Sequence, residues 1–223
     1  ANCRIRSYPV HENMGMVWIW MGDPALADTA DIYDLPEYHQ DGWGVGFGDA
    51  LDVEANYLLL CDNLCDPTHV NYVHPSTLGN PDGINAPVTF EDAPWGVLTE
   101  RFTDDSSPTG FVEAFGTYDG KVDMWQRYLM YTPSVSIIDF GATATGSGSY
   151  QSGGDGRLQV YSCHFMTPIT EYARLTAGYT CGISCPMTSP SATGSATSFA
   201  LRSRRTKRSC RPCRRKKTVM PTG

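Results

Sequence analysis

Alternating apolar and polar positions run through much of the chain and predict β-strands. Residues 4–22 hold β-branched side chains and two tryptophans, which favour strands, and the run ends at Gly22-Asp23-Pro24. Residues 86–140 have the pattern of successive strands, with turns at Asp104–Gly110 and Asp119-Gly120. The larger part of the chain is therefore expected to form an antiparallel sheet.

A second group of segments completes the pattern. Ser134–Phe140 and Arg157–Met166 predict a strand pair. Residues 23–50 are rich in Asp, Pro and Gly and predict an irregular connection with short elements. Residues 53–73 have a helical pattern that Pro67 interrupts. The sum is an α+β domain dominated by an antiparallel sheet, whose main early helix carries two histidines.

Composition and charge divide the chain into two parts. With 223 residues, 41% of them hydrophobic, it can build one sizeable domain or a domain and part of a neighbour. Residues 1–200 hold all 24 acidic residues and seven Lys and Arg, whereas residues 201–223 hold ten Lys and Arg and no acid. No apolar run has the length of a membrane span, and no signal peptide is recognisable. Ala1 therefore reads as a cut into a longer protein.

Residues 181–223 form a basic tail of low complexity. No Asp or Glu follows Glu171, and Arg202–Lys217 holds ten basic residues in sixteen positions. Such a run is typical of a solvated, disordered tail or of a contact with nucleic acid or an anionic surface. We favour a third interpretation, an out-of-frame translation of a GC-rich gene, and do not expect nucleic acid as a partner.

Eight cysteines without a secretory signal predict free thiols in a reducing compartment, and hence a cytoplasmic protein. The spacings Cys181-x3-Cys185 and Cys210-x2-Cys213 match zinc-binding pairs only loosely. The second pair lies among arginines in a segment without apolar periodicity, so we do not predict a structural zinc site.

Residues 62–74, with the sequence DNLCDPTHVNYVH, are the segment of the chain that is most indicative of a chemical function. It places His69 and His74 five residues apart, with Asp66 three residues before the first histidine and Asn63 three before that. Two histidines and one carboxylate are the facial ligand set of non-haem Fe(II) oxygenases, which leaves positions open for O2. Two unrelated histidines on a helix are the alternative, and would be the better interpretation of a bare HxxxxH spacing.

Helical geometry sets a condition on this pair. On one straight helix, positions 69 and 74 would lie about 140° apart, which is poor for binding one metal ion. Asp66-Pro67 reads as an N-cap followed by Pro at the first helical position. The histidines are therefore expected on a short helix or its frayed end, where both imidazoles can reach one metal.

The block resembles the iron-binding segment of the Rieske non-haem iron oxygenases, especially oxygenase subunits of the vanillate O-demethylase type. Further segments resemble that family in the same order, namely RSYPV (6–10), GMVWIWMGD (15–23), Asp123-Met124-Trp125, Pro133-Ser134-Val135 and His164–Glu171. The resemblance covers roughly residues 4–180. It implies a helix-grip, START-like domain in which a curved antiparallel sheet wraps a long helix and leaves an apolar cavity, here incomplete at both ends.

The same resemblance implies a division of the chain. Residues 1–22 would be the end of a Rieske domain with connecting strands, residues 23–180 a partial mononuclear-iron catalytic domain, and residues 181–223 the tail. The Cys-x-His and Cys-x2-His ligands of a Rieske [2Fe–2S] cluster are absent from the sequence. The cluster is therefore expected in a missing N-terminal part.

The resemblance also implies the roles of single residues. His69 and His74 would be the iron ligands, and Asn63 would lie close to the iron. Asp66 would bridge a ligand histidine to the Rieske cluster of a neighbouring subunit and fix its tautomer. A helix cap is a compatible alternative role for Asp66. In the family the third ligand is an aspartate on a late helix, which residues 172–223 cannot supply because they hold no carboxylate, and Glu171 does not match that position.

By resemblance, the chain is part of an aromatic-ring or O-demethylating oxygenase. Electrons from NAD(P)H would pass through a separate reductase and a Rieske cluster to mononuclear Fe(II), which activates O2 to attack an aromatic substrate. The full-length protein would be a homotrimer, and the 223-residue chain alone would be inactive. The alternative is a non-catalytic helix-grip module that binds a hydrophobic ligand without Fe(II).

Four further residues are candidates for the active-site cavity. His164 could line it, although a histidine on a strand is more often packed or exposed. Trp125, Tyr128 and Tyr131 could border a substrate pocket, although core packing explains them equally well.

Overall fold

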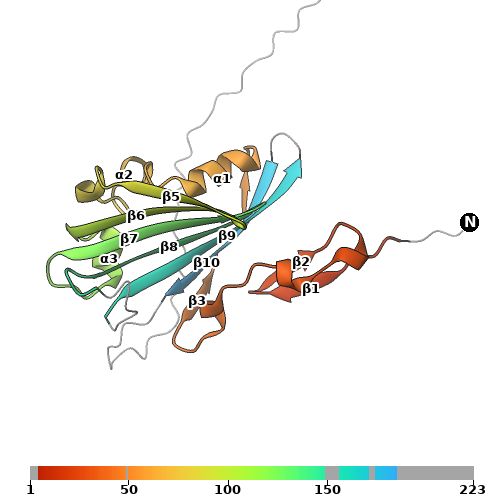
Figure 1. Cartoon of the computed structure of the whole chain (residues 1–223), viewed down its shortest axis with the longest axis horizontal. Helices are drawn as coiled ribbons and strands as arrows, with labels where there is room; N and C mark the ends of the chain where they lie inside the picture. Colours follow the sequence, from red (N-terminus) through yellow and green to blue (C-terminus); the bar gives the residue numbers. More distant parts are fainter. Residues whose placement is uncertain (1–4, 49, 149–155, 171–173, 185–223) are drawn as a thin grey trace, which may run out of the picture.

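The computed structural model describes residues 5–48, 50–148, 156–170 and 174–184, the last range by its backbone alone. Its centre is an eight-stranded antiparallel sheet with the order β3-β10-β9-β8-β7-β6-β5, in which β4 also pairs with β10 (Figure 1). The strands are β3 (Gly44–Phe47), β4 (Leu51–Val53), β5 (Val88–Ala93), β6 (Gly96–Ser106), β7 (Val122–Tyr131), β8 (Val135–Ala144), β9 (Leu158–Thr170) and β10 (Arg174–Ser184). The predicted α+β class with its antiparallel sheet is confirmed.

The strand pair predicted after residue 134 forms the middle of this sheet. β8 pairs antiparallel with β9, from Val135 opposite Phe165 to Ala142 opposite Leu158. β7 and β8 pair without interruption from Val122 opposite Ala144 to Tyr131 opposite Val135. Because side chains alternate between the faces of a strand, these registers decide which residues face the helices and which face the N-terminal segment.

The N-terminal segment forms a hairpin and a series of short turns. β1 (Val10–Asn13) and β2 (Met16–Ile19) confirm the strands predicted within residues 4–22. The short 3-10 helices that follow are η1 (Pro24–Leu26), η2 (Thr29–Asp31) and η3 (Pro36–His39). They agree with the predicted irregular connection, but β3 in the same stretch is a strand of the main sheet.

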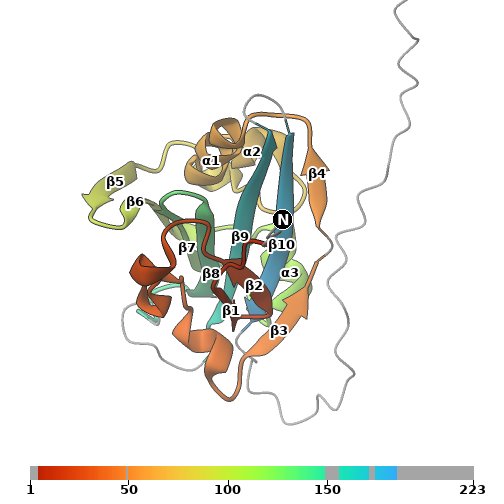
Figure 2. The same cartoon turned by 90° about the vertical axis from the view of Figure 1, so that its right-hand side faces the viewer.

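The two faces of the sheet carry different cores. On one face, Met14 and Leu35 of the N-terminal segment pack against Ile137, Cys163 and Phe165. Figure 2 shows the hairpin on this side, in front of β8, β9 and β10. Cys61, Met130 and Met166 form a second cluster on the opposite face. A third cluster, at the far end of that face, comprises Val112, Val122, Met124, Ala142 and Leu158.

Within the described part of the chain, three α-helices cover the second face. They are α1 (Tyr57–Cys65), α2 (Val70–Val73) and α3 (Gly110–Phe115), and a 3-10 turn η4 (Pro81–Gly83) follows α2. The helix against the sheet, α1, has nine residues and is shorter than the long helix that the family resemblance implies. The two histidines do not lie on it, so the expectation that the main early helix carries them is wrong.

Helix α3 was not expected from the sequence. The segment 104–110 reads as a turn, but the side chain of Thr109 accepts a hydrogen bond from the backbone N–H of Val112 and starts a helix there. Tertiary packing of Val112 against the sheet then outweighs the weak local helical pattern. Among the helices that the described residues form, none is long and apolar enough to span a membrane.

Candidate metal centre

The histidine segment begins where α1 is forced to end. Asn56 caps the start of α1 by accepting from the N–H of Leu58 at 2.9 Å, and the N–H of Asp66 donates to the carbonyl of Asn63 at the other end. Pro67 cannot donate the next helical hydrogen bond. The carboxylate of Asp66 instead accepts from the N–H of Thr68 at 2.7 Å, which turns the chain away from the helix axis.

Asp66 is therefore the C-cap of α1 and not the predicted N-cap of the following helix. The N-cap of α2 is His69, and its side chain makes no capping hydrogen bond. The prediction failed because the carboxylate closes a local turn with Thr68 before α2 begins. The backbone role of Asp66 is nevertheless a capping one, as the sequence suggested.

His69 and His74 flank α2 at its two ends. The N–H of His74 donates to the carbonyl of Val70 at 2.9 Å. The carbonyl of His74 in turn accepts from the N–H groups of Thr77, Leu78 and Gly79, at 3.2, 3.1 and 2.8 Å. These bonds fix the turn that follows the second histidine. The predicted placement of both histidines on a short helix or its ends is confirmed.

The two imidazoles converge. Their ring centroids lie 5.7 Å apart and their planes meet at 69°. An imidazole that bonds a metal ion at about 2 Å has its centroid about 3 Å from the ion, so two rings on one ion lie at most about 6 Å apart. The side chains of His69 and His74 thus fit two positions of one metal site.

Asn63 and Asp66 lie beside the first histidine. The amide nitrogen of Asn63 is 3.5 Å from Nε2 of His69, too long a contact to occupy that nitrogen firmly. Oδ2 of Asp66 lies 3.6 Å from Nδ1 of His69, and this buried Nδ1 makes no hydrogen bond within the described residues. Nδ1 therefore faces the carboxylate, and Nε2 is the nitrogen available to a metal.

The electrostatics of Asp66 favour its charged form. Partial burial acts to raise the pKa of this carboxyl group, but hydrogen bonds from Thr68 and the neighbouring His69 outweigh it, so the pKa lies below its ordinary value. This charged carboxylate lies beside the imidazole of His69, with its Oδ2 3.6 Å from Nδ1.

The described residues supply no third ligand. They contain no group of three His, Cys, Asp or Glu side chains close enough to hold a metal ion. Burial raises the pKa of Cys65, near the histidines in sequence, to about 11, and it also raises the pKa of Cys61. A raised pKa disfavours the thiolate, which is the form of cysteine that binds a metal ion. Glu171 lies outside the described residues.

The other candidates from the sequence are spread over both faces of the sheet. His164 lies on β9, two residues before Met166, and therefore on the face that packs against α1. Tyr131 belongs to the core on the opposite face and stacks on Trp95. Tyr128 is buried, and burial raises its pKa. Trp125 is the one of the three aromatic candidates that lines a recess.

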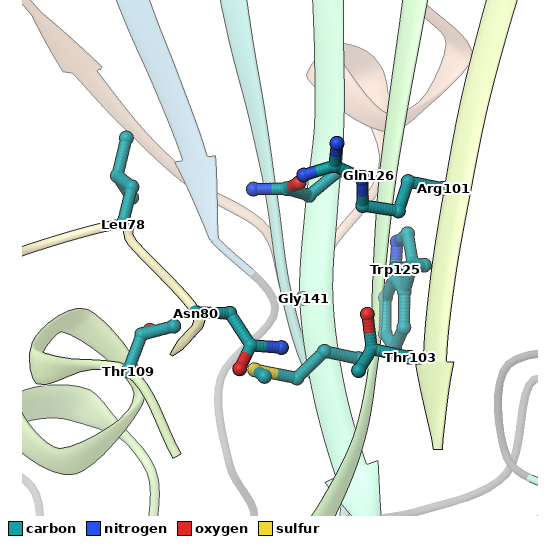
Figure 3. A pocket seen from close by; sticks show the side chains of 9 residues that line it. Leu78, Asn80, Arg101, Thr103, Thr109, Trp125, Gln126 and Gly141 are labelled. Carbon is teal, nitrogen blue, oxygen red and sulfur yellow. The ribbon is translucent and has the colours of Figure 1, made fainter. Parts of the chain in front are cut away.

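This recess contains residues that the sequence analysis did not single out. Its wall is formed by Leu78, Asn80, Arg101, Thr103, Thr109, Met124, Trp125, Gln126 and Gly141 (Figure 3). It is small, about 30 Å³, and both apolar and polar side chains line it. The available signal was the alternation Thr99, Arg101, Thr103, which places a cation on the inner face of a strand.

His164 gives an expected pH dependence of stability. Burial lowers its pKa to about 4, and its Nε2 lies 3.0 Å from the hydroxyl of Ser162. An unfolded histidine has a pKa of about 6.5, so between these values the unfolded chain binds a proton that the folded chain does not. Stability therefore falls as the pH is lowered from 6.5 towards 4, by up to about 2 kcal/mol at pH 5. Part of the residue is accessible to solvent, which makes this an upper value.

Urea denaturation of the H164Q variant at pH 7 and pH 5 checks this expectation. The variant is expected to lose less stability on acidification than the unsubstituted protein. His11, which is exposed in the hairpin, provides the matched control H11Q and is expected to leave the acid slope unchanged. Equal acid slopes for H164Q and the unsubstituted protein would rule out a proton-linked role of His164.

The fold and the converging histidines together define the class of protein, which is the catalytic domain of a Rieske-type oxygenase. The family model described as vanillate O-demethylase oxygenase C-terminal domain matches residues 53–201. The chain belongs to this family. The match starts at the last residue of β4, shortly before α1, and ends at residue 201. It therefore continues past residue 180, where the resemblance noted from the sequence ends.

Characterised relatives are oxygenase components. The iron–sulfur subunit TsaM1 of the toluene-4-sulfonate monooxygenase system of Comamonas testosteroni is 36% identical over 65% of this chain and 42% of its own length. The vanillate O-demethylase oxygenase subunit of Pseudomonas sp. (strain ATCC 19151) is 33% identical over 75% of this chain and 52% of its own length. The chain thus spans about half the length of these relatives.

A solved structure shows the same fold. Dicamba monooxygenase bound to dicamba superposes with a TM-score of 0.69 and 26% identity, over 80% of this chain and 49% of that one. The complex with 3,6-dichlorosalicylic acid gives a TM-score of 0.70 at the same identity. The helix-grip architecture predicted from the sequence resemblance is confirmed.

Proposed function

We propose that the chain is the iron-binding part of an O-demethylating or ring-oxidising oxygenase that acts on an aromatic compound. The observation that carries this proposal is the convergence of His69 and His74, with ring centroids 5.7 Å apart, at the two ends of α2. The relatives named as vanillate, dicamba and toluene-4-sulfonate oxygenases support the reaction class. The domain limits 1–22, 23–180 and 181–223 remain predictions.

The donor set fits two of the three protein positions of a mononuclear Fe(II) site. When bound, Fe(II) would supply the reductive activation of O2. His69 would bind through Nε2, because its Nδ1 faces Asp66, and His74 would be the second ligand. The side-chain amide of Asn63 would lie beside Nε2 of His69, the first ligand nitrogen. The third ligand would have to come from outside the described residues.

We further infer that electrons reach this site through Asp66. A reductase using NAD(P)H and a [2Fe–2S] Rieske cluster would supply them, and the name iron–sulfur subunit for a relative supports such a cluster. The carboxylate of Asp66 remains 42% exposed on its outer side while Oδ2 lies 3.6 Å from His69, so it can contact both a ligand and an approaching partner. A homotrimer would bring the cluster of one subunit to this side chain of the next.

The D66N variant tests that route, because asparagine keeps the side-chain oxygen that accepts from Thr68. We expect both iron centres to be retained and single-turnover electron transfer to slow about 10- to 100-fold, as is usual when a carboxylate partner of a ligand histidine is lost. Stopped-flow oxidation of the Rieske chromophore measures this rate. An unchanged rate in D66N would contradict the bridging role.

The proposed activity itself is tested with the full product of the gene that encodes this chain. That protein, supplied with reductase, NADH, O2 and a methoxybenzoate, is expected to release formaldehyde. Activity should be lost after chelation and restored by Fe(II) but not by Zn(II). The alternative, a ligand-binding module, predicts tight binding of an apolar aromatic with no dependence on Fe(II) and no formaldehyde. A cytoplasmic location stays a prediction from the cysteine content.

A further inference from the structure

Arg101 occupies an unusual position for a cation. It lies in the middle of β6, opposite Gln126 of β7, on the face of the sheet that carries Met130 and packs against α1. Only 5% of the residue is exposed to solvent. None of the ion pairs that the described residues form includes Arg101. A cation buried without a carboxylate partner lowers stability, so its place in the sheet calls for another reason.

Arg101 is bonded to the histidine segment. Its Nη1 donates to the carbonyl of Pro67 at 3.2 Å, which joins the middle of the sheet to a turn 34 positions earlier in the chain. The buried Nε has no hydrogen-bond partner within the described residues. Pro67 is itself fully buried, so removal of the guanidinium would leave its carbonyl without a donor and shielded from water.

A buried tyrosine shows that the turn lies over this part of the sheet. Tyr128 stands on β7 opposite Thr99, two positions along β6 from Arg101 and on the same face. Burial raises the pKa of its hydroxyl, the positive charge of Arg101 lowers that pKa, and the negative charge of Asp66 raises it. One buried hydroxyl is therefore within electrostatic reach of a charge in the sheet and of a charge at the turn. The turn that begins at Asp66 is seated over β6 and β7.

The turn held by Arg101 leads into α2, the helix that both histidines flank. This helix has four residues, and a helix of that length gains too little from its own hydrogen bonds to hold its place. Pro67 lies two residues before His69, so the bond from Arg101 fixes the start of α2 relative to the sheet. From the other side, the N–H of Asn80 donates to the side-chain oxygen of Asn71 at 2.6 Å. The separation of the two imidazoles thus depends on contacts made from outside α2.

We propose that Arg101 is a positioning residue for the metal site. Through the carbonyl of Pro67 it fixes the turn before His69, so that both imidazoles can reach one ion. In this role Arg101 contacts neither metal nor substrate. That the ion is the iron of an oxygenase rests on the function proposed above, whereas the placement of the histidine segment can be measured without metal.

The first test compares R101M with R127M. Methionine retains an unbranched side chain but donates no hydrogen bond. The full gene product, freed of mononuclear iron by chelation, is titrated with Fe(II) without oxygen, and the EPR signal of the Fe(II)–nitric oxide adduct gives the affinity. R101M is expected to bind Fe(II) about 10-fold more weakly, the lower end of the range for residues that orient a ligand. R127M removes the same group from the opposite face of the sheet and should leave this affinity unchanged.

Stability is expected to change in the opposite order. R127M leaves Glu100 and the buried Asp139 without their cation, so its urea midpoint should fall. R101M removes a buried unpaired charge, which offsets the lost bond to Pro67, so its midpoint should fall less than that of R127M. R101K, which can still donate to the carbonyl of Pro67, should recover most of the Fe(II) affinity. With a merely structural role of Arg101, the loss of affinity would follow the loss of stability.

Hydrogen exchange in the metal-free protein measures the placement itself. The N–H groups of Val73 and His74 donate to the carbonyls of His69 and Val70, both at 2.9 Å. Their exchange should be about 10-fold faster in R101M, the factor that corresponds to the loss of one hydrogen bond, and unchanged in R127M. R101L, which also lacks a donor, replaces R101M if that variant does not fold.

The outcomes separate the positioning role from the iron chemistry. Undiminished Fe(II) affinity in a folded R101M, unchanged exchange in that variant, or an equal loss of affinity in R127M would each overturn the proposal. Faster exchange in R101M, in a protein that binds no Fe(II) even without substitution, would uphold the placement of the histidine segment by Arg101 and refute the oxygenase function.

Discussion

Replacing either His69 or His74 with alanine will remove mononuclear iron and abolish turnover. Each variant leaves a single imidazole where two now converge at 5.7 Å, and the described residues offer no other cluster of ligands. Loss of a residue that merely orients a ligand costs about 10- to 100-fold in metal affinity, and loss of the ligand itself should cost more. Iron content per protein, together with the EPR signal of the Fe(II)–nitric oxide adduct, measures the effect.

A matched control separates ligation from general damage. H11A removes an exposed histidine of the hairpin, far from α2 in sequence, and should retain iron and turnover. The spectrum of the Rieske cluster should be unchanged in all three variants, because the cluster is expected in another domain. A full complement of mononuclear iron in H69A or H74A would show that the converging pair is not the metal site.

The largest effect on stability is expected at Asp139. This residue is 2% exposed, and its Oδ1 accepts from the indole N–H of Trp125 at 2.9 Å and from the amide of Gln159 at 2.8 Å. Burial raises the pKa of its carboxyl group, although these bonds and Arg127 favour the charged form. D139A would remove the acceptor of the buried indole N–H of Trp125, one of the two acceptors of the Gln159 amide and one of the two carboxylates beside Arg127, at a cost of about 3 kcal/mol.

Chemical denaturation at neutral pH measures this loss. D139N keeps an oxygen for Trp125 and should cost less than D139A. D104A, which removes an exposed carboxylate from β6, should change the free energy of unfolding by no more than about 0.5 kcal/mol. If D139A were as stable as D104A, the buried network would not contribute to the stability of the sheet.

The elements that the sequence predicted well are those with strong local patterns. The strands around residues 134–170 are rich in β-branched and aromatic residues, and the structure places them as β8 and β9. The short elements β3 and α3 were harder to predict, because each depends on partners that are distant in the chain. Gly44–Phe47 contains two glycines and has little strand propensity, yet it pairs with β10.

The candidate site likewise contains residues that the sequence could predict and residues that it could not. His69 and His74 could be found because both lie in one short segment around Pro67, so their proximity is a local property. Arg101 could not be connected with that segment, since its bond to the carbonyl of Pro67 crosses 34 positions of the chain. Only the registers of β6 with β7 and the packing of α1 on the sheet bring the two together.

The position of β10 has a consequence for the order of assembly during synthesis. Among the described strands, β3 and β4 pair with β10 alone, although β10 begins at Arg174 and β4 ends at Val53. The strand that leads into α1 thus leaves the ribosome well before its partner exists, a delay of about 10 s at typical elongation rates. We therefore expect the histidine segment to be made early and anchored late. Iron delivered during translation would meet an unfinished site.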